Sequence, residues 1–298
     1  MTIGFLGLGE VGSRYAADLI KNGADVKGYD PKLGHSEFAN FENRVREAGV
    51  TICADTKELV EGSDIILCPT TCAAAIPIAK TCAEYLKPGQ IYVDFNSALP
   101  SVKAECEKYI SASGADFVDA VVLNHPAIYG LHNPGLMAGP KAKYVIEVLE
   151  KYGMDQNRYM GEKNGMACGF KCTRSIFMKG VEALFIEFVC AARKNGIMDE
   201  CIDSVVENLG DDLRKQLCML VKGDIIHAKR RSEEIGGIMP MLDELGLDKT
   251  MTVATTKKLQ WAASLGLKEY FNNEMPDEHD AVDAFIRVQE TGSPEVKE

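Results

Sequence analysis

Three glycines near the start of the chain have the spacing of a dinucleotide-binding turn. They form a GxGxxG motif between an apolar stretch at 2–6 and an amphipathic stretch that begins near Val11. In this context the first glycine permits a tight turn, the second admits a pyrophosphate to the backbone, and the third lets a helix pack against the strand. The amides of the helix N-terminus would bind the phosphates. The predicted cofactor-binding residues of this motif are Gly7, Leu8, Gly9, Glu10, Val11 and Gly12.

An acidic residue at the end of the next predicted strand bears on which dinucleotide binds. Asp30 follows the glycines at about the 20-residue distance typical of the carboxylate that binds the ribose diol of NAD. The same carboxylate would repel a 2′-phosphate, so the sequence favours NAD over NADP. Lys32 weakens this preference, because its ammonium would partly compensate a phosphate. The alternative interpretation of Asp30 is a solvated strand end.

The elements that must position these residues are predicted by short apolar stretches alternating with helical ones. Such alternation over the first 160 or so residues indicates crossover units and a parallel sheet. We therefore predict a Rossmann-type, doubly wound α/β domain at 1–162, with a helix at 11–22 after the first strand. The predicted strands are Thr2–Leu6, Asp25–Tyr29, 50–53, Ile65–Cys68, 91–95, Asp116–Val122 and Gly135–Ala138.

The second part of the chain changes character. Strand-like stretches disappear after about Gly165, and apolar residues recur at steps of three and four, as in helices with one buried face. We predict an all-α domain at 163–298 that binds substrate and forms a homodimer, with the active site between the two domains. The tail from about Asn272 is acidic and is expected to fray. The predicted helices are 165–195, 201–217, 221–236, 238–245 and 250–265.

Composition excludes several classes of function. The chain has 33 Lys plus Arg against 44 Asp plus Glu, a net charge of −11, which disfavours nucleic acid and anionic membranes as partners. No apolar stretch is long enough to span a membrane, and the start lacks a basic leader segment, so a cytoplasmic location is expected. The 10 cysteines do not suggest a disulfide framework. Two CxxxC pairs lack further ligands at a suitable spacing, so no metal site is predicted.

The motifs, taken in order, resemble the β-hydroxyacid dehydrogenase superfamily, which includes 6-phosphogluconate dehydrogenase. The strand end at 93–97 contains an Asn96-Ser97 pair similar to that of the phosphogluconate enzymes, and Gly165, Ala167 and Lys171 are similar to the family's GxGxxxK. The segment 230–261 resembles a branch whose C-terminal helical domain has no assigned function. The resemblance implies an NAD-dependent dehydrogenase of the CH–OH group of a small hydroxy acid.

The sequence departs from the family pattern at two places. The family carries a Ser-Gly-Gly loop that binds the substrate's acid group after an Asp-Ala strand end, but here the strand 119–122 continues into Leu-Asn-His-Pro at 123–126. The family's asparagine four residues after the lysine is Ser175. Both changes bear on the substrate class more than on the reaction type.

Oxidation of an alcohol requires a base for the hydroxyl proton, and Lys171 is the candidate general acid/base. An unperturbed lysine titrates near 10.4, so burial or a cationic neighbour must favour its neutral form; Arg174 and Lys179 lie within two turns. Asn96 and Ser97 are predicted catalytic residues, either of which is suited to bind the substrate hydroxyl or the nicotinamide amide, with turn capping as the alternative. Further predicted contacts are Pro69, Thr70 and Thr71 for the cofactor ribose, and Asn124, His125, Arg174 and Ser175 for the substrate.

Other interpretations stay open at this stage. Imine-reducing relatives share the architecture but often have aspartate or tyrosine in place of the lysine, and a dinucleotide-binding protein without turnover is a different class. A decarboxylating variant of the oxidation is also compatible with the sequence. Arg230 and Arg231 are suited to bind an acid group, although a solvated helix face is the favoured interpretation.

Overall fold

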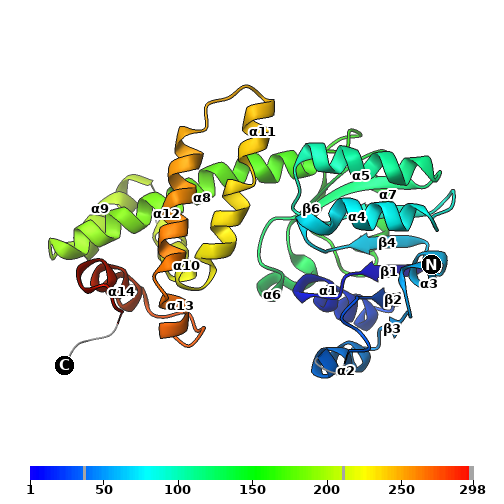
Figure 1. The fold of residues 1–298 in the computed structure, drawn as a ribbon, viewed down its shortest axis with the longest axis horizontal. Coiled ribbons are helices and arrows are strands. Elements are labelled where there is room, and N and C mark those ends of the chain that lie inside the picture. The colour runs from blue at the N-terminus through cyan, green and yellow to red at the C-terminus, as the bar shows by residue number, and fades with distance from the viewer. Residues whose placement is uncertain (36–37, 210–211, 295–298) are drawn as a thin grey trace. The chain divides into compact units, whose positions relative to one another are not determined.

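The computed structural model describes residues 1–35, 38–209 and 212–294. The chain forms two compact units, Met1–Cys172 and Thr173–Glu298. The division falls about ten residues after the predicted boundary at 162, because the first turns of the long helix that follows pack within the first unit. Figure 1 shows the elements of both units.

The first unit is built on one eight-stranded sheet with the strand order β3-β2-β1-β4-β5-β6-β7-β8. All neighbours pair in parallel except β6 and β7, which are antiparallel. The predicted doubly wound fold is therefore confirmed, with an antiparallel addition and an edge strand, β8, that the sequence analysis missed. The strands are β1 (Thr2–Leu6), β2 (Asp25–Tyr29), β3 (Thr51–Ile52), β4 (Ile65–Cys68), β5 (Ile91–Asp94), β6 (Asp116–Val122), β7 (Gly135–Ala138) and β8 (Asn157–Tyr159).

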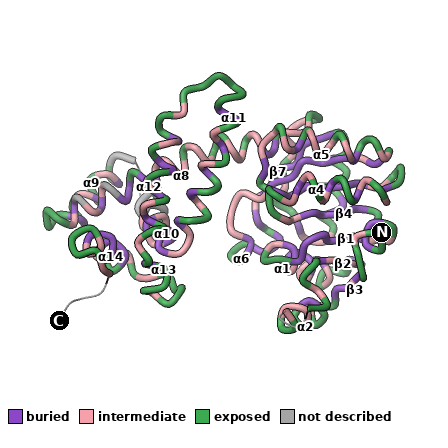
Figure 2. The backbone as a smooth tube through the Cα atoms, viewed as in Figure 1, coloured by how far each residue is buried: buried purple, intermediate pink, exposed green. Residues whose placement is uncertain are grey.

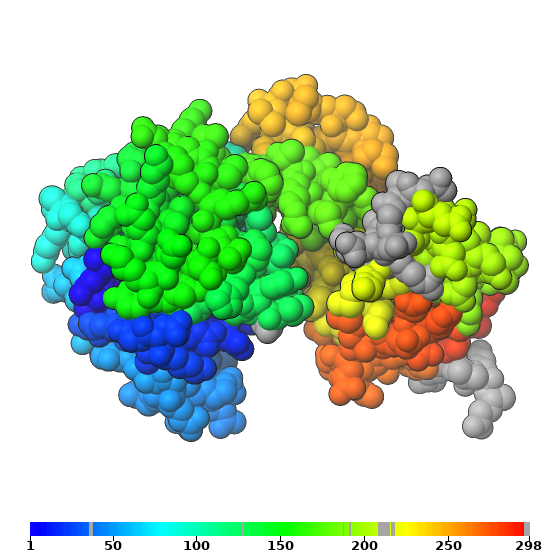
Figure 3. Space-filling model, turned by 180° about the vertical axis from the view of Figure 1, so that it is seen from behind, coloured from blue at the N-terminus to red at the C-terminus, as the bar shows by residue number. Residues whose placement is uncertain are grey.

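Helices cover both faces of this sheet because its strands are apolar on both sides, as parallel strands require. One core joins Tyr15 and Leu19 of α1 to Val145 and Leu149 of α7, and a second core packs α3, α4 and α5 on the other face. Figure 2 shows the strands as the most buried part of this unit, and Figure 3 shows the segment containing α7 next to α1. The helices of the unit are α1 (Glu10–Lys21), α2 (Ala39–Glu47), α3 (Thr56–Glu61), α4 (Cys72–Ala83), α5 (Pro100–Ala112), α6 (Pro126–Tyr129) and α7 (Ala142–Glu150).

The second unit is helical, as predicted, but two of its segments differ from expectation. The helix expected at 201–217 includes two positions outside the described residues, and the part that follows them belongs to one 25-residue helix. The acidic tail, expected to fray, contains α14, whose Ala281, Val282 and Phe285 are buried. Its start is capped by the Asp277 carboxylate, which accepts from the His279 amide. The helices are α8 (Met166–Lys194), α9 (Met198–Leu209), α10 (Asp212–Gly236), α11 (Met239–Glu244), α12 (Thr250–Ser264), α13 (Leu267–Tyr270) and α14 (Glu278–Thr291).

No helix among the described residues is both long and apolar enough to cross a membrane. Within the same residues, the cysteines form no disulfide. The homodimer stays a prediction.

A buried ion cluster lies inside the helical unit. The Arg231 guanidinium donates to the carboxylates of Asp224, at 2.6 Å, and of Glu182. The two carboxylates are 1% and 0% exposed. Arg231 is therefore not part of a solvated helix face, whereas Arg230 forms an i,i+4 pair with Glu234. Burial, together with the neighbouring Asp224 carboxylate, raises the pKa of Glu182 to about 9.

Replacing Glu182 by glutamine is expected to reduce the pH dependence of the helical unit's stability. Because the pKa of Glu182 rises from 4.5 to about 9 on folding, the native state keeps a proton that the unfolded chain releases. This stabilisation is fully present below about pH 4.5 and is lost as the pH rises toward 9. Urea unfolding at pH 6 and pH 8.5 can be followed by the fluorescence of Trp261, the single tryptophan, which packs on Phe285.

The matched control is Glu233→Gln, at an exposed position of α10, the helix that carries Arg231. It should keep the wild-type loss of stability between the two pH values, whereas Glu182→Gln should lose most of it. Equal pH dependence in Glu182→Gln and wild type would contradict the assignment.

Candidate active site

The glycine-rich turn joins β1 to α1 in the geometry that its spacing predicts. Gly7 has a φ of +99°, a conformation that L side chains rarely adopt, and its amide donates to the Tyr29 carbonyl at 2.8 Å. A Cβ on Gly12 would lie 2.0 Å from the Gly7 carbonyl oxygen, so only glycine fits there. A Cβ on Gly9 would meet nothing within 4 Å, so the backbone there is open to an approaching group. These three features fit a pyrophosphate at the start of α1.

Asp30 lies directly beside this turn. Its carboxylate accepts from the Leu8 amide at 2.9 Å and from the Lys32 amide at 3.0 Å, and the residue is 7% exposed. It is therefore not a solvated strand end. Each carboxylate oxygen keeps a lone pair for a further donor, so the position fits the ribose diol that the sequence analysis assigned to it.

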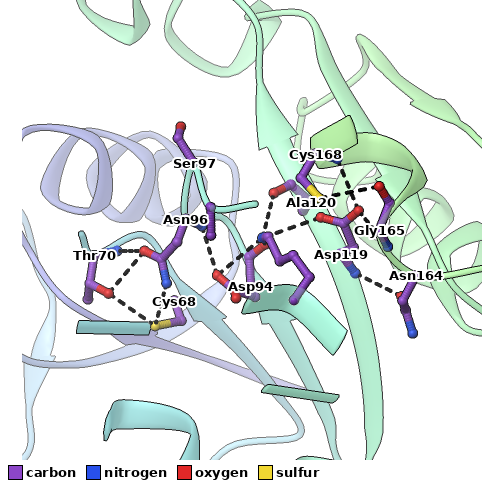
Figure 4. A network of polar contacts seen from close by, with 12 residues as sticks. Cys68, Thr70, Asp94, Asn96, Ser97, Asp119, Ala120, Asn164, Gly165 and Cys168 are labelled. Atoms are coloured by element: carbon purple, nitrogen blue, oxygen red, sulfur yellow. Dashed lines mark hydrogen bonds and ion pairs between the residues drawn. The ribbon is translucent and has the colours of Figure 1, made fainter. Parts of the chain in front are cut away.

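The ends of β4 and β5 are joined through Asn96. Its side-chain oxygen accepts from the Thr70 amide at 2.7 Å and from the Thr70 hydroxyl at 3.0 Å, and the residue is fully buried. Asn96 thus holds the 69–71 segment in place through its side-chain oxygen, and its amide nitrogen donates to the Cys68 Sγ at 3.9 Å. Ser97, the next residue, is exposed. The two predicted catalytic neighbours differ in what they contact (Figure 4).

Lys171 and Ser97, which are 74 residues apart in the chain, meet through their side chains. The Lys171 Nζ donates to the Ser97 Oγ at 2.6 Å. This contact brings together the strand-end motif and the helix lysine, at the edge of the sheet where the parallel strands end and where ligands bind in doubly wound folds. The neighbouring Cys172 does not compete as a nucleophile near neutral pH, because burial raises the pKa of its thiol to about 11, although the Lys171 ammonium opposes this shift.

The first turn of α8, which positions Lys171, is capped from the sheet. The amides of Gly165 and Cys168 both donate to one carboxylate oxygen of Asp119, at 3.1 Å each. A carboxylate at this place satisfies amides that have no partner within the helix and complements the helix dipole. Ala167 and Cys168 are buried against Val121 and Leu136 of the sheet. For these reasons the start of α8 belongs to the first unit.

A fully buried lysine, missed by the sequence analysis, lies beneath these segments. The Lys103 ammonium is 3.3 Å from a carboxylate oxygen of Asp94 and 3.3 Å from one of Asp119. Burial lowers the pKa of Lys103, but the two carboxylates outweigh this effect and raise it overall. Burial raises the pKa of Asp94, with Lys103 opposing. One signal was available in the sequence: Lys103 shares a helix stripe with the apolar Cys106 and Ile110.

The loop that replaces the family's Ser-Gly-Gly segment is tied to α1. Buried Asn133 accepts from the Asn124 amide at 3.2 Å, and its own amide group donates to the Asn124 carbonyl at 3.0 Å and to the Tyr15 hydroxyl at 3.2 Å. The His125 Nδ1 lies 3.7 Å from the Glu10 carboxylate. Of the predicted substrate residues, His125 is thus next to the glycine-rich turn.

The other two predicted substrate residues follow Lys171 along α8. Arg174 is exposed and Ser175 is half-buried, and both belong to the second unit. Lys179, expected as a cationic neighbour of Lys171, instead pairs with Glu234 at 3.6 Å.

One group of possible metal ligands, Asp199, Glu278 and His279, occurs among the described residues. It does not suit a cation, because the Arg193 guanidinium lies 3.3 Å from the His279 Nδ1. The guanidinium already places a positive charge beside this group, and the His279 Nε2 lies 3.9 Å from the Glu278 carboxylate.

This fold and turn define a dinucleotide-binding protein of the Rossmann type. Residues 2–154 match the model of the NAD-binding domain of 6-phosphogluconate dehydrogenase, and the chain belongs to this family. Residues 192–262 match a domain of unknown function, DUF1932. Both findings agree with the resemblance inferred from the motifs.

Relatives and solved structures place the chain near hydroxyacid dehydrogenases. An uncharacterized 28.5 kDa protein of Methanothermus fervidus is 31% identical over 79% of this chain and 88% of its own. A mitochondrial 3-hydroxyisobutyrate dehydrogenase of Drosophila melanogaster is 30% identical over 52% of this chain and 50% of its own.

Two solved structures share the fold. The 3-hydroxyisobutyrate dehydrogenase of Mycobacterium tuberculosis, with L-serine, has a TM-score of 0.74 at 16% identity and covers 95% of this chain and 98% of its own. An imine reductase from Pseudomonas sp. has a TM-score of 0.58 at 16% identity and covers 95% of this chain and 99% of its own.

Substituting Gly9 by alanine is expected to weaken NAD binding about tenfold or more without lowering the melting temperature. The added Cβ meets no protein atom within 4 Å, but it occupies the space through which a pyrophosphate would approach the backbone. Calorimetric titration with NAD and a thermal melt test the two parts. Gly180→Ala, another glycine with open space around it, serves as the control and should leave NAD affinity unchanged. An unaltered NAD affinity in Gly9→Ala would contradict the prediction that the pyrophosphate binds at this turn.

Proposed function

We propose that this protein is an NAD-dependent oxidoreductase of the CH–OH group of a small hydroxy acid, with Lys171 as the general acid/base. The observation that carries the proposal is the 2.6 Å contact between the Lys171 Nζ and the Ser97 Oγ. It places an amine and a hydroxyl together at the carboxyl end of the sheet, in a unit whose glycine-rich turn fits a dinucleotide. Membership in the NAD-binding family supports the class of reaction.

Each residue of this pair has a defined task in the proposed reaction. Neutral Lys171 accepts the proton of the substrate hydroxyl, and the same amine returns it to the oxygen in the reverse direction. Ser97 holds the amine in place and donates its own proton toward the substrate oxygen. The nicotinamide, when bound, accepts the hydride from the substrate carbon. The glycine-rich turn binds the pyrophosphate, and Asp30 the ribose diol.

The substrate's acid group is proposed to be bound differently from that of enzymes with a Ser-Gly-Gly loop. His125 stands in the substituted loop, held near Glu10, and Asn124 is fixed by Asn133. Arg174 and Ser175 are the further candidates, one turn beyond Lys171 on α8.

A second candidate function, imine reduction, is favoured by the fold shared with imine reductases. The lysine at 171 argues against it, because an amine that exchanges a proton with an oxygen suits alcohol oxidation better than protonation of an imine nitrogen. Turnover of imines with no turnover of hydroxy acids would favour imine reduction over hydroxy-acid oxidation.

Lys171→Met is expected to lower kcat by about 10²- to 10⁴-fold, the usual contribution of a positioned acid/base. NAD affinity should change by no more than about twofold, because the glycine-rich turn and Asp30 lie on other elements. Oxidation of a hydroxy-acid panel, including 3-hydroxyisobutyrate and serine, is followed at the nicotinamide absorbance. Lys163→Met, at an exposed lysine just before α8, is the control and should retain activity. A Lys171→Met variant with wild-type kcat would reject the assignment.

NAD is expected to bind more tightly than NADP. The substitution Asp30→Asn is expected to reduce this difference in affinity. The carboxylate would repel a 2′-phosphate, whereas the amide would not. The variant should also lose stability of about 1–3 kcal/mol, because an asparagine cannot accept from both the Leu8 and Lys32 amides with its two side-chain atoms. Titration of wild type and variant with both cofactors, beside thermal melts, measures both effects. Tighter binding of NADP by the wild type would contradict the role given to Asp30.

A further inference from the structure

Lys103 lies at the junction of the two segments that carry Ser97 and Lys171. Its Nζ is 2.6 Å from the Asp94 carbonyl oxygen and 3.3 Å from the Ala120 carbonyl oxygen, besides the carboxylates of Asp94 and Asp119. All three charged residues are 0% exposed. A buried ammonium with two buried carboxylates, cut off from water, can keep its charges only through these contacts.

One carboxylate of this group controls the segment of Ser97. An Asp94 oxygen accepts from the Asn96 amide at 2.8 Å, which fixes the turn immediately before Ser97. Asn96 in turn accepts from Thr70. The direction of the Ser97 side chain therefore depends on where the Asp94 carboxylate lies.

The other carboxylate controls the start of the helix that carries Lys171. Asp119 accepts from the Gly165 and Cys168 amides with one oxygen, and its other oxygen faces Lys103. Lys171 follows Cys168 by less than one turn, so a shift of the capped turn is transmitted to its amine. The negative charge that one lysine leaves uncompensated is stabilised by the helix N-terminus.

We infer that Lys103, Asp94 and Asp119 form a positioning triad that fixes the Ser97 hydroxyl and the Lys171 amine relative to each other. Figure 4 shows Asp94 and Asp119 on neighbouring strands, with Asn96 beside the first and Gly165 and Cys168 beside the second. The Lys171–Ser97 hydrogen bond joins the two side chains, and the triad fixes the backbone from which each of them extends. The inference rests on the proposed function for its catalytic meaning, but its structural content can be tested without a substrate.

The test uses amide hydrogen exchange of the full chain, followed residue by residue by NMR, in Asp119→Asn. This variant balances the buried charges, one carboxylate against one lysine, so it is expected to fold. Asp119 accepts from the Gly165 and Cys168 amides, whereas the Asn96 amide donates to Asp94. Exchange about tenfold faster at all three amides is expected, because the effect reaches Asn96 through Lys103 and Asp94. Exchange that is faster at Gly165 and Cys168 but unchanged at Asn96 would overturn the triad.

Lys103→Met extends the test from the other side. It should accelerate exchange at Asn96, Gly165 and Cys168 together, and lower kcat about 10²-fold with KM and NAD affinity changed by no more than about twofold, as expected of a misplaced acid/base. Ile110→Ala, on the same buried face of α5, is the matched control for a weakened helix. It should leave these amides and kcat unchanged relative to a reference amide in β1. If Lys103→Met does not fold, Asp119→Asn alone decides.

The outcomes separate this inference from the proposed function. Coupled exchange in a protein that oxidises no hydroxy acid would uphold the triad and reject the function. Oxidation of a hydroxy acid with uncoupled exchange would uphold the function and reject the triad. An Ile110→Ala variant that reproduces the Lys103→Met exchange pattern would also reject it, because a weakened helix would then be sufficient.

Discussion

The arrangement of the candidate site depends on a lysine ammonium buried beneath the sheet edge. Moving such a charge out of water costs several kcal/mol, and the contacts with Asp94 and Asp119 offset that cost without leaving a large net gain. Removing one partner would be far more damaging, by about 3–5 kcal/mol, because it leaves a buried charge uncompensated. An interaction of this kind contributes little to overall stability but strongly specifies geometry, since few backbone arrangements satisfy all its partners.

The sequence predicted the elements of the sheet well because buried parallel strands are continuous apolar stretches bounded by turn residues. The same rule missed the three-residue strand β8 (Asn157–Tyr159), in which Arg158 is exposed and its two neighbours are only partly buried. It also misjudged the tail, where acidic residues on the solvent side of α14 obscured the spacing of Ala281, Val282 and Phe285. Both errors arise where tertiary contacts decide the structure and local composition does not.

For the site, motif spacing was sufficient for the glycine-rich turn, Asp30 and the lysine of α8. Motif spacing was insufficient to identify the residues that position these groups. Asn96 has the right chemistry to bind a ligand, but its oxygen is taken by Thr70, a residue far away in the chain. The sequence identified Asp119 only as part of a strand-end motif. Its role as the cap of α8 comes from a contact with Gly165, 46 residues away, which no local sequence pattern predicts. Lys103 looked like any helix lysine, and only its apolar stripe distinguished it.

Each unit contains one buried cation between two buried carboxylates, lysine in the first unit and arginine in the second. The two cations differ in size and in the groups that they contact. In the first, a compact lysine ammonium fits between backbone carbonyls as well as carboxylates, and the spare carboxylate oxygens serve the amides of Asn96 and α8. In the second, the broad guanidinium of Arg231 needs the room that Gly223 provides, because a Cβ there would lie 2.6 Å from it. Burial and the neighbouring Asp224 carboxylate raise the pKa of Glu182 to about 9, so the excess negative charge of this cluster is relieved by a proton that Glu182 retains. The first group is therefore suited to holding backbone segments in a fixed geometry, whereas the second binds and releases a proton as the pH changes.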